Sequence, residues 1–366
     1  MVREEFGIAA GGYEARVVSE GATLRALTFR GRDLVAPFGV DEPRPAMRGA
    51  LLAPWPNRTA DGRYTFDGVT HQLELTEPET GNAAHGLAHS LPFHPTPTPE
   101  PAATAAHPTP TDPTSVATAA PAAHSAALDP AAGSDRVVLT GWIEAQEGYP
   151  WRVRLDVEFS VGVCGFRQRI TATNESDRPA PFGMGVHPYL LAGPAAPGAV
   201  DDWELELPAH EVLLVSPDRL LPVARVAVDD PATATLRRSG GGLDFSGARL
   251  IGGTVLNHAF TALQPDADGR VVIRLTDPAH AAGSGSGSAG SGGGGRRGVE
   301  VGLGAGTPWV QLYSADHNPG PDRRHALAVE PMTCPPDALN SGTDLRILSP
   351  GASTSLEWTL RALDEP

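Results

Sequence analysis

The chain has 366 residues, with 43 acidic and 28 basic side chains and a formal net charge of −15. Nucleic acids and anionic membranes are bound by basic surfaces, so this balance argues against both as partners and leaves small neutral ligands open. The length could hold two ordinary domains, but β-sandwiches of more than about 200 residues often form one unit.

The N-terminal stretch MVREEFGIAAGGYEARVV lacks a basic region followed by a sustained apolar core. It does not have the pattern of a secretory signal, and we expect a cytoplasmic protein. No run approaches 18 uninterrupted apolar residues, so no membrane span is predicted. In a reducing compartment, the two cysteines, Cys164 and Cys334, are expected to be buried thiols rather than a disulfide.

Short runs in which apolar and polar residues alternate recur along the chain. In order they are YEARVVSE from Tyr13, ATLRALTF from Ala22, RYTFDG from Arg63, HQLEL from His71, RVVLTGWIE from Arg136, RVRLDVEFS, GFRQRITATN, WELELP, GRVVIRL, PWVQLYS and STSLEWTLRA. A period of two over so many segments is typical of antiparallel sheets with one buried face. Asp67-Gly68 predicts a hairpin turn. We therefore predict an all-β protein with two large sheets packed face to face and a concave outer face free to hold a ligand.

Two stretches of low complexity interrupt this pattern. Residues 93–133 are rich in Pro, Ala and Thr and cannot bury enough apolar surface to offset the entropy of ordering. Residues 279–298, which include GSGSGSAGSGGGG, have the composition of a flexible loop between two strands. Because strand patterns of one type continue on both sides, we predict a single domain over residues 1–366 with two disordered loop insertions.

Two stretches in the first quarter of the chain have side chains suited to a binding site. PWPNRTADGRYTFDG places Arg58 close to Trp55 and Asn57, and GNAAHGLAH contains His85. Taken singly, Arg58 is compatible with a surface cation on a turn, and His85 with a loop imidazole that caps a backbone group.

Two later stretches supply an imidazole and a carboxylate. FGMGVHPYLLAG places His187 among glycines, aromatics and aliphatics, and LAVEPMTCPPDALNSG places Glu330 after an apolar strand. Alone, His187 is compatible with a core imidazole and Glu330 with a strand-end carboxylate in water. A rigid strand can instead hold a carboxylate at the rim of a sheet, where desolvation raises its pKa and suits it to act as a general base. The pKa of a histidine side chain needs only a small shift for it to act as the acid.

In this order, the motifs PWPNR…GRY.FDG, N..HGL, GVHPYL and VEPMTCPPDALNSG resemble those of the aldose 1-epimerases, also called galactose mutarotases. The resemblance extends over nearly the whole chain apart from the two insertions, to the closing LSPGASTSLEWTLRA. It implies a large antiparallel β super-sandwich that interconverts the α and β anomers of a free hexose, with no metal and no organic cofactor.

The resemblance also implies roles for four residues. Glu330 would take the proton of the C1 hydroxyl, and His187 would protonate the ring oxygen, so that the ring opens to the aldehyde. Rotation about the C1–C2 bond and closure on the other face would give the second anomer. His85 would orient the same region of the sugar, and Arg58 would bind sugar hydroxyls, to which its fork of donors is suited.

Further residues are assigned to the sugar-binding surface. Asn57 lies next to Arg58, and Trp55 offers either an apolar face for the sugar ring or a place in the core. The family commonly has an Asp that grips sugar hydroxyls in a motif L-D-x-x-F, and this chain has LNHAF, with Asn257 at that place. Because Asn also donates and carries no charge, the sugar preference is expected to differ. We expect His258 to cover a strand end.

Other chemistries are weighed against this interpretation. His85 and His89 lie four residues apart, which aligns two metal ligands only on a helix, and a glycine between them disfavours one, so no metal site is predicted. A hexose-6-phosphate 1-epimerase would need a further cationic pocket, for which Arg63 or Arg323-Arg324 are the candidates.

The last alternative is a carbohydrate-binding module that keeps the scaffold without turnover. The presence of His85, His187 and Glu330 argues against it, and Asn257 argues for it. In either case the expected partner is a small-molecule sugar, and the expected assembly is a monomer or a homodimer.

Overall fold

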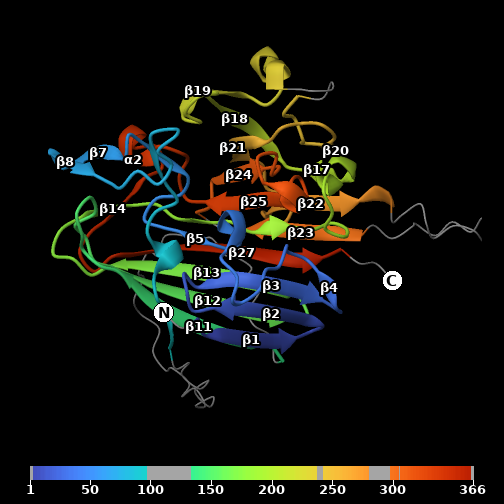
Figure 1. Cartoon of the computed structure of the whole chain (residues 1–366), viewed down its shortest axis with the longest axis horizontal. Coiled ribbons are helices and arrows are strands. Elements are labelled where there is room, and N and C mark those ends of the chain that lie inside the picture. Colours follow the sequence, from blue (N-terminus) through green and yellow to red (C-terminus); the bar gives the residue numbers. More distant parts are fainter. Residues whose placement is uncertain (1–2, 97–132, 237–241, 280–296, 305, 364–366) are drawn as a thin grey trace, which may run out of the picture.

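The computed structural model describes residues 3–96, 133–236, 242–279, 297–304 and 306–363. Within these ranges the chain is nearly all β, and three antiparallel sheets make up most of it (Figure 1). The predicted all-β, antiparallel class is therefore confirmed.

Hydrogen bonds between neighbouring strands define the strand order of each sheet in the described ranges. The nine-stranded sheet contains, from one edge to the other, β10 (His94–Pro95), β11 (Asp135–Ile143), β12 (Val153–Gly162), β13 (Gly165–Asn174), β27 (Ser353–Ala362), β23 (Arg297–Leu303), β22 (Val271–Asp277), β17 (Glu204–Glu206) and β20 (Arg249–Leu250). The eight-stranded sheet contains β19 (Pro222–Ala227), β18 (Ala209–Val215), β21 (Asn257–Leu263), β24 (Trp309–Tyr313), β25 (Leu327–Met332), β15 (Gly185–Val186) and β5 (Leu51–Leu52), with β16 (Tyr189–Leu190) also paired to β25. The four-stranded sheet contains β1 (Glu5–Ala10), β2 (Tyr13–Val18), β3 (Thr23–Phe29) and β4 (Arg32–Asp33).

Smaller elements connect these sheets. The two-stranded ribbons are β6 (Arg58–Ala60) with β9 (Asn82–Ala84), β7 (Arg63–Phe66) with β8 (Val69–Gln72), and β14 (Ala180–Phe182) with β26 (Arg346–Leu348). Helical segments are short: η1 (Pro45–Met47), η2 (Ala88–Ser90), η3 (Ala199–Asp202), η4 (Pro231–Leu236), η5 (Gly320–Asp322) and α2 (Ala338–Ser341). No helix in the described ranges is long and apolar enough to cross a membrane.

One hydrophobic core joins the three sheets. It contains Val17 of β2, Val157 of β12 and Leu312 of β24, and all three are fully buried. Because successive side chains of a strand point to opposite faces, the apolar half of each alternating run reaches this core. Strand β12 is an example, since its side chains alternate between buried and half-buried from Val153 to Phe159. The period-two pattern of the sequence thus predicts which face of each strand is buried.

The predicted hairpin turn at Asp67-Gly68 is confirmed. It joins β7 to β8, whose last pair is Phe66 with Val69. Both turn residues have positive φ, 50° for Asp67 and 74° for Gly68, as the tight turns of two-residue hairpins require.

The ends of the two predicted insertions need correction. Phe93 is buried in the core, and β10 pairs with β11 through His94. Gly141 of β11 makes room for Phe93, since a Cβ at Gly141 would lie 2.8 Å from the phenyl ring. Residues 297–298 likewise belong to β23. The remainder of the predicted insertions, residues 97–132 and 280–296, lies outside the described residues.

The expectation for the cysteines was right for one of the two. Both are free, but only Cys334 is buried, and burial raises the pKa of its thiol to about 12. Cys164 is exposed because it lies in the hairpin between β12 and β13, beside the exposed Val163.

Candidate active site

The predicted acid and base lie side by side on the eight-stranded sheet. Gly185 pairs with Met332 of β25, and Tyr189 pairs with Ala328 of the same strand. Because His187 lies midway between Gly185 and Tyr189, it is opposite Glu330. On the other side of β25, Glu330 faces Gln311 of β24 directly. Three polar side chains from three adjacent chain segments therefore form one row across the sheet.

This row points away from the hydrophobic core. Val329 and Leu312, the sequence neighbours of Glu330 and Gln311, both belong to the core. Since side chains alternate between faces, Glu330 and Gln311 project from the opposite face of the sheet. His258 pairs with Leu312 and so lies on the core side, in agreement with the expectation that it does not reach the site.

His187 and Glu330 are in direct contact. Nε2 of His187 lies 3.3 Å from Oε1 of Glu330, and the side chains are only 6% and 2% exposed. Burial raises the pKa of Glu330 to about 8, which the positive charge of Arg58 partly offsets. Burial, with a smaller contribution from the positive charge of Arg58, lowers the pKa of His187 to about 4. Each group is thus pushed toward its uncharged form, as expected for ionisable groups removed from water.

Tyr189 packs against the histidine. Its ring is stacked on that of His187, with centroids 5.2 Å apart and planes 15° from parallel. The backbone of His187 is fixed as well, because its N–H donates to Ala50 and its carbonyl accepts from Gly49. The imidazole is therefore held by both its backbone and its ring face.

The β6–β9 ribbon brings His85 to the same place. His85 follows β9 directly, has a φ of 66°, and donates its backbone N–H to the carbonyl of Asn57. Its ring lies edge-on to that of His187, with centroids 5.5 Å apart. Burial, with smaller contributions from the neighbouring His187 and Arg58, holds the pKa of His85 well below its ordinary value, so the imidazole is neutral at pH 7.

Arg58 opens the same ribbon and pairs with Ala84 of β9. Its Nε and Nη2 donate to the carboxylate of Glu77, at 2.6 and 2.9 Å. Its Nη1 has no hydrogen-bond partner among the described residues. The ribbon is tied to the chain that follows β25, because Asp337 donates its N–H to the Arg58 carbonyl and accepts from the N–H of Ala60.

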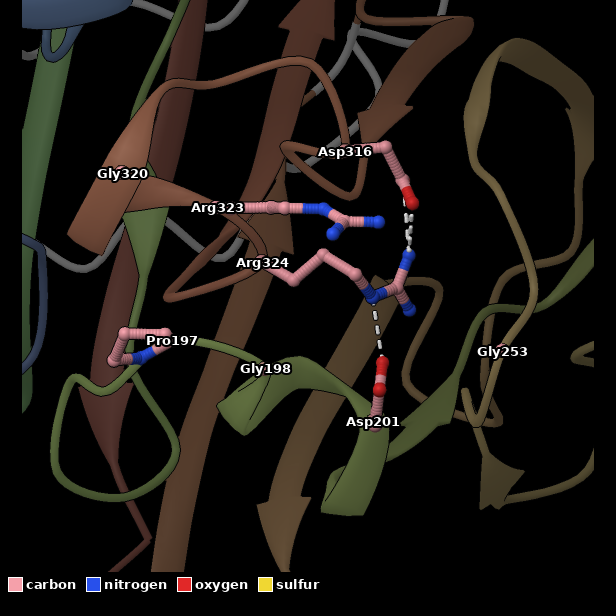
Figure 2. Close-up of a pocket in the computed structure, with 8 residues that line it drawn as sticks. All are labelled: Pro197, Gly198, Asp201, Gly253, Asp316, Gly320, Arg323 and Arg324. Carbon is pink, nitrogen blue, oxygen red and sulfur yellow. Dashed lines mark hydrogen bonds and ion pairs between the residues drawn. The ribbon is translucent and has the colours of Figure 1, made fainter.

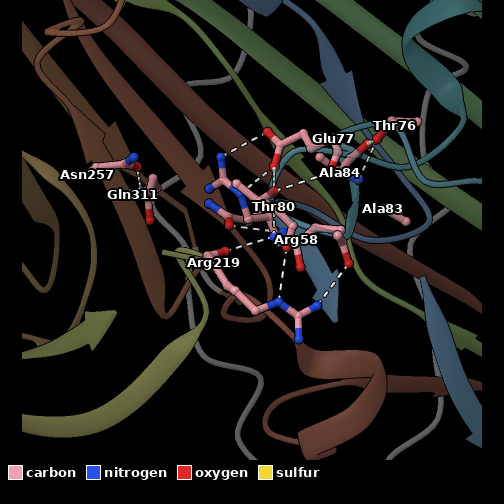
Figure 3. Close-up of polar contacts among 12 residues, drawn as sticks. Arg58, Thr76, Glu77, Thr80, Ala83, Ala84, Arg219, Asn257 and Gln311 are labelled. Atoms are coloured by element: carbon pink, nitrogen blue, oxygen red, sulfur yellow. Dashed lines mark hydrogen bonds and ion pairs between the residues drawn. The ribbon is translucent and has the colours of Figure 1, made fainter. Parts of the chain in front are cut away.

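Gln311 and Asn257 form a hydrogen-bonded pair at the edge of the row (Figure 3). Nε2 of Gln311 donates to Oδ1 of Asn257 at 2.9 Å. This arrangement leaves Nδ2 of Asn257 available to donate and Oε1 of Gln311 available to accept. Gln311 was not singled out from the sequence, because PWVQLYS has an ordinary strand pattern and cross-strand register is not visible in a single sequence.

Buried polar atoms without a partner gather at this site. Among the described side chains, they include Nδ1 of His85, Oε1 of Gln311 and Oε2 of Glu330. Leaving a buried donor or acceptor unpaired costs about 1–3 kcal/mol, so native proteins rarely retain such atoms without a use for them. Several of them on adjoining side chains indicate a site for a ligand with its own donors and acceptors.

Two residues assigned to the sugar surface have structural contacts instead. Trp55 lies in the core, and its indole N–H donates to the carbonyl of Ala83 at 3.2 Å, which favours the core alternative. Asn57 has a φ of 55°, and its Oδ1 accepts from the N–H of Arg58, so it shapes the turn that presents Arg58.

Two of the arginines considered for a phosphate line a pocket whose lining includes none of the site residues described above. Arg324 and the exposed Arg323 line a pocket of about 440 Å³ (Figure 2). The guanidinium of Arg324 is already engaged by Asp201 and Asp316. Arg63 is exposed on β7. This leaves little free positive charge for a phosphate at Arg324.

The structure gives no support to a metal site on His85 and His89. His89 lies in η2, whereas His85 precedes it in the left-handed conformation, so no helical turn aligns the two rings. Among the described residues, no group of three or more His, Cys, Asp or Glu side chains is arranged to hold a metal ion.

Comparisons with known proteins agree with this picture. The family model for aldose 1-epimerase matches residues 5–113 and 129–281. The uncharacterized protein YihR of Escherichia coli K12 is 31% identical over 347 residues, covering 94% of this chain and 88% of YihR. The chain therefore belongs to the aldose 1-epimerase family, as its motifs suggested. Glu330 lies beyond the residues matched by the family model, and its place in the site follows from the strand register.

Solved structures show the same fold. A galactose mutarotase-like protein from Clostridium acetobutylicum aligns with a TM-score of 0.70 at 15% identity, covering 100% of this chain and 99% of that one. The GalM/aldose epimerase homologue of C. elegans aligns with a TM-score of 0.69 at 18% identity, covering 99% and 100%. The predicted galactose-mutarotase type of β super-sandwich is thus confirmed.

Proposed function

We propose that this protein is an aldose 1-epimerase, which interconverts the α and β anomers of a free hexose by opening and re-closing the ring. The observation that carries the proposal is the 3.3 Å contact between His187 and Glu330 on the outward face of the sheet. The two oxygens of a cyclic hemiacetal are bonded to the same carbon. An acid and a base that lie side by side can therefore reach both of them.

In the proposed reaction, Glu330 takes the proton of the C1 hydroxyl while His187 gives a proton to the ring oxygen. The bond between C1 and the ring oxygen breaks, and the electrons of the O–H bond form the aldehyde carbonyl. After rotation about C1–C2, His187 takes the hydroxyl proton back and Glu330 returns a proton to the carbonyl oxygen. The closed ring then has the opposite configuration, and both groups are restored.

The pKa shifts support a single proton shared by the pair. With a pKa of about 8 for Glu330 and about 4 for His187, the two groups together hold one proton between these values. In the sugar-free protein the shifts place it on Glu330. Opening the closed ring requires it on His187, and sugar hydroxyls that donate to the unpartnered Oε2 of Glu330 would favour that transfer.

The surrounding groups suit a polyol. In this proposal, the neutral imidazole of His85 and the guanidinium of Arg58 would orient the sugar near C1. The amide of Asn257 offers a donor, and Gln311 offers an acceptor. We infer that an uncharged hexose is the substrate, because Arg324 is engaged by two aspartates and offers little to a phosphate.

Polarimetry tests the proposal directly. Freshly dissolved α-glucose or α-galactose should reach its equilibrium rotation faster when the protein is added, in proportion to protein concentration. The corresponding 6-phosphates should be accelerated less. If the protein binds a sugar but leaves the drift at its spontaneous rate, it is a binding module on this scaffold and the proposal is wrong.

A further inference from the structure

We propose that Glu77 is a positioning residue, which holds the Arg58 guanidinium in the one orientation that presents Nη1 to the sugar. The proposal rests on the proposed function, since it assigns Arg58 to contact sugar hydroxyls. It adds a residue from the stretch HQLELTEPETGN, none of whose carboxylates belongs to the candidate site residues.

The contact between the two residues is a bidentate fork. Nε and Nη2 of Arg58 donate to Oε2 and Oε1 of Glu77 at 2.6 and 2.9 Å, and the side chains are 12% and 22% exposed. Two parallel bonds fix the plane of a guanidinium as well as its distance. An unpaired Arg side chain would lose rotamer entropy on binding a sugar, and Glu77 removes much of that cost beforehand.

Glu77 itself is fixed by the turn around it. Its backbone N–H and carbonyl both pair with Asn82, the first residue of β9. The hydroxyl of Thr80 donates to its carboxylate at 3.3 Å, and Nδ2 of Asn82 donates to that hydroxyl at 3.0 Å. The carboxylate therefore has little freedom to follow Arg58 if the guanidinium moves.

A second arginine clamps this turn from outside (Figure 3). Arg219, in the connection between β18 and β19, donates to the carbonyls of Thr80 and Gly81 at 3.0 and 2.9 Å. It also pairs with Asp61 of the turn that follows β6, at 2.6 Å, and its own carbonyl accepts from Asn82. The clamp joins the turn that carries Glu77 to the eight-stranded sheet that carries Glu330 and Gln311.

The pairing with Glu77 determines which donors of the Arg58 guanidinium stay free for a ligand. With Nε–H and one N–H of Nη2 committed to Glu77, the donors that remain for a ligand are both N–H groups of Nη1 and the second N–H of Nη2. Arg58 also acts electrostatically on His187, Glu330 and Tyr313, so its charge lies close to the row. Glu77 thus sets both the direction of the free donors and the position of the charge.

The test compares Glu77→Gln and Glu77→Asp with the wild type in anomer-exchange kinetics. The sugar hydroxyls that Arg58 would contact are present in both the bound substrate and the transition state. Loss of a positioned Arg58 donor should therefore weaken the binding of both equally. We expect Glu77→Gln to raise KM about tenfold, as for the loss of one hydrogen bond to a charged group, with kcat changed less than threefold. Glu77→Asp should recover part of the loss, and Arg219→Gln should give a smaller rise in KM.

The matched control is Glu5→Gln. Glu5 pairs with Arg25 at 2.5 Å with similar exposure, 27% against 17%, but lies on β1 in another sheet. This variant should lose similar stability in thermal unfolding and leave KM unchanged. If Glu77→Gln also loses only stability, with KM unchanged, Glu77 is structural and the proposal is overturned.

A second readout does not depend on turnover. The Nε–H signal of Arg58 in ¹⁵N NMR, assigned by its absence from Arg58→Lys, should exchange slowly with water in the wild type and rapidly in Glu77→Gln. Slow exchange in both proteins would overturn the proposal. If the wild type accelerates no aldose, the proposed function fails, and the Nε–H signal alone then decides whether Glu77 holds Arg58.

Discussion

The buried pair of His187 and Glu330 determines the expected pH dependence. A group that burial keeps neutral titrates far from its ordinary range, and here the two shifts run in opposite directions, to about 4 and about 8. Below the lower value both groups are protonated and no base remains, whereas above the higher value both are deprotonated and no acid remains. The pair holds one proton only between these limits.

We therefore expect kcat/KM for anomer exchange to follow a bell, with flanks near pH 4 and pH 8. The measurement is the exchange rate at each pH, with the rate of the buffer alone subtracted, because acid and base also catalyse mutarotation in water. An enzymatic rate that stays constant from pH 7 to pH 10 would contradict the shared proton.

Among the secondary-structure elements, the register between neighbouring strands brings the site residues together. His187 is distant in the chain from Gln311 and Glu330, but all three occupy one row across β25 and its two neighbours. The β6–β9 ribbon then adds Arg58 and His85 from the side. In the proposed reaction, rigid strands would position the proton-transfer groups, and a short ribbon would position the groups that meet the sugar hydroxyls.

A substitution at Gly86, next to His85, tests whether the chain that follows the β6–β9 ribbon must hold His85 in place. Gly86 has a φ of 70°, and a Cβ there would lie 2.2 Å from the backbone carbonyl oxygen of Ala53. Gly86→Ala should therefore lower the free energy of unfolding by at least about 2 kcal/mol and, by displacing His85, reduce turnover. Thermal unfolding and exchange rates measure the two effects. Gly68→Ala, also at positive φ but with open space around it, should cost less stability and leave turnover unchanged.

Most of the strands and several of the candidate site residues could be predicted from the sequence. Alternation identified the strands, and Asp67-Gly68 identified a hairpin. The motifs identified His187 and Glu330 as candidates, but their contact depends on pairing between segments 143 positions apart, which a single sequence does not reveal. Gln311 was missed for the same reason. Phe93 was assigned to an insertion because its neighbours are low in apolar residues, whereas its own burial depends on the space left by a glycine on another strand.

At the scale of the whole molecule, the strands that flank each low-complexity stretch are neighbours. β10 pairs with β11, and β22 pairs with β23 from Asp277 and Arg297 onward. A short connection can therefore span each gap. The free-energy cost of closing a flexible loop grows only with the logarithm of its length, by about 0.6 kcal/mol for each doubling.

Replacing residues 280–296 with a short Gly-Ser-Gly-Gly link should therefore change little. We expect exchange rates within about twofold of the wild type and a free energy of unfolding within about 1 kcal/mol. Chemical denaturation and the exchange assay measure both. A large loss of turnover in a protein of unchanged stability would mean that this stretch takes part in function.

If His187 and Glu330 act as one acid–base pair, loss of either side chain should remove most of the enzymatic turnover, and two-dimensional exchange NMR of the two anomers measures that turnover. At saturating sugar and pH 7, Glu330→Gln and His187→Ala should each reduce the enzymatic exchange rate about a hundredfold or more, as for loss of a positioned proton-transfer group. His258→Gln, which alters a buried histidine on the core side of the same sheet, should keep a rate within about threefold of the wild type. Near-normal exchange in either Glu330→Gln or His187→Ala would mean that the two side chains do not act as an acid–base pair.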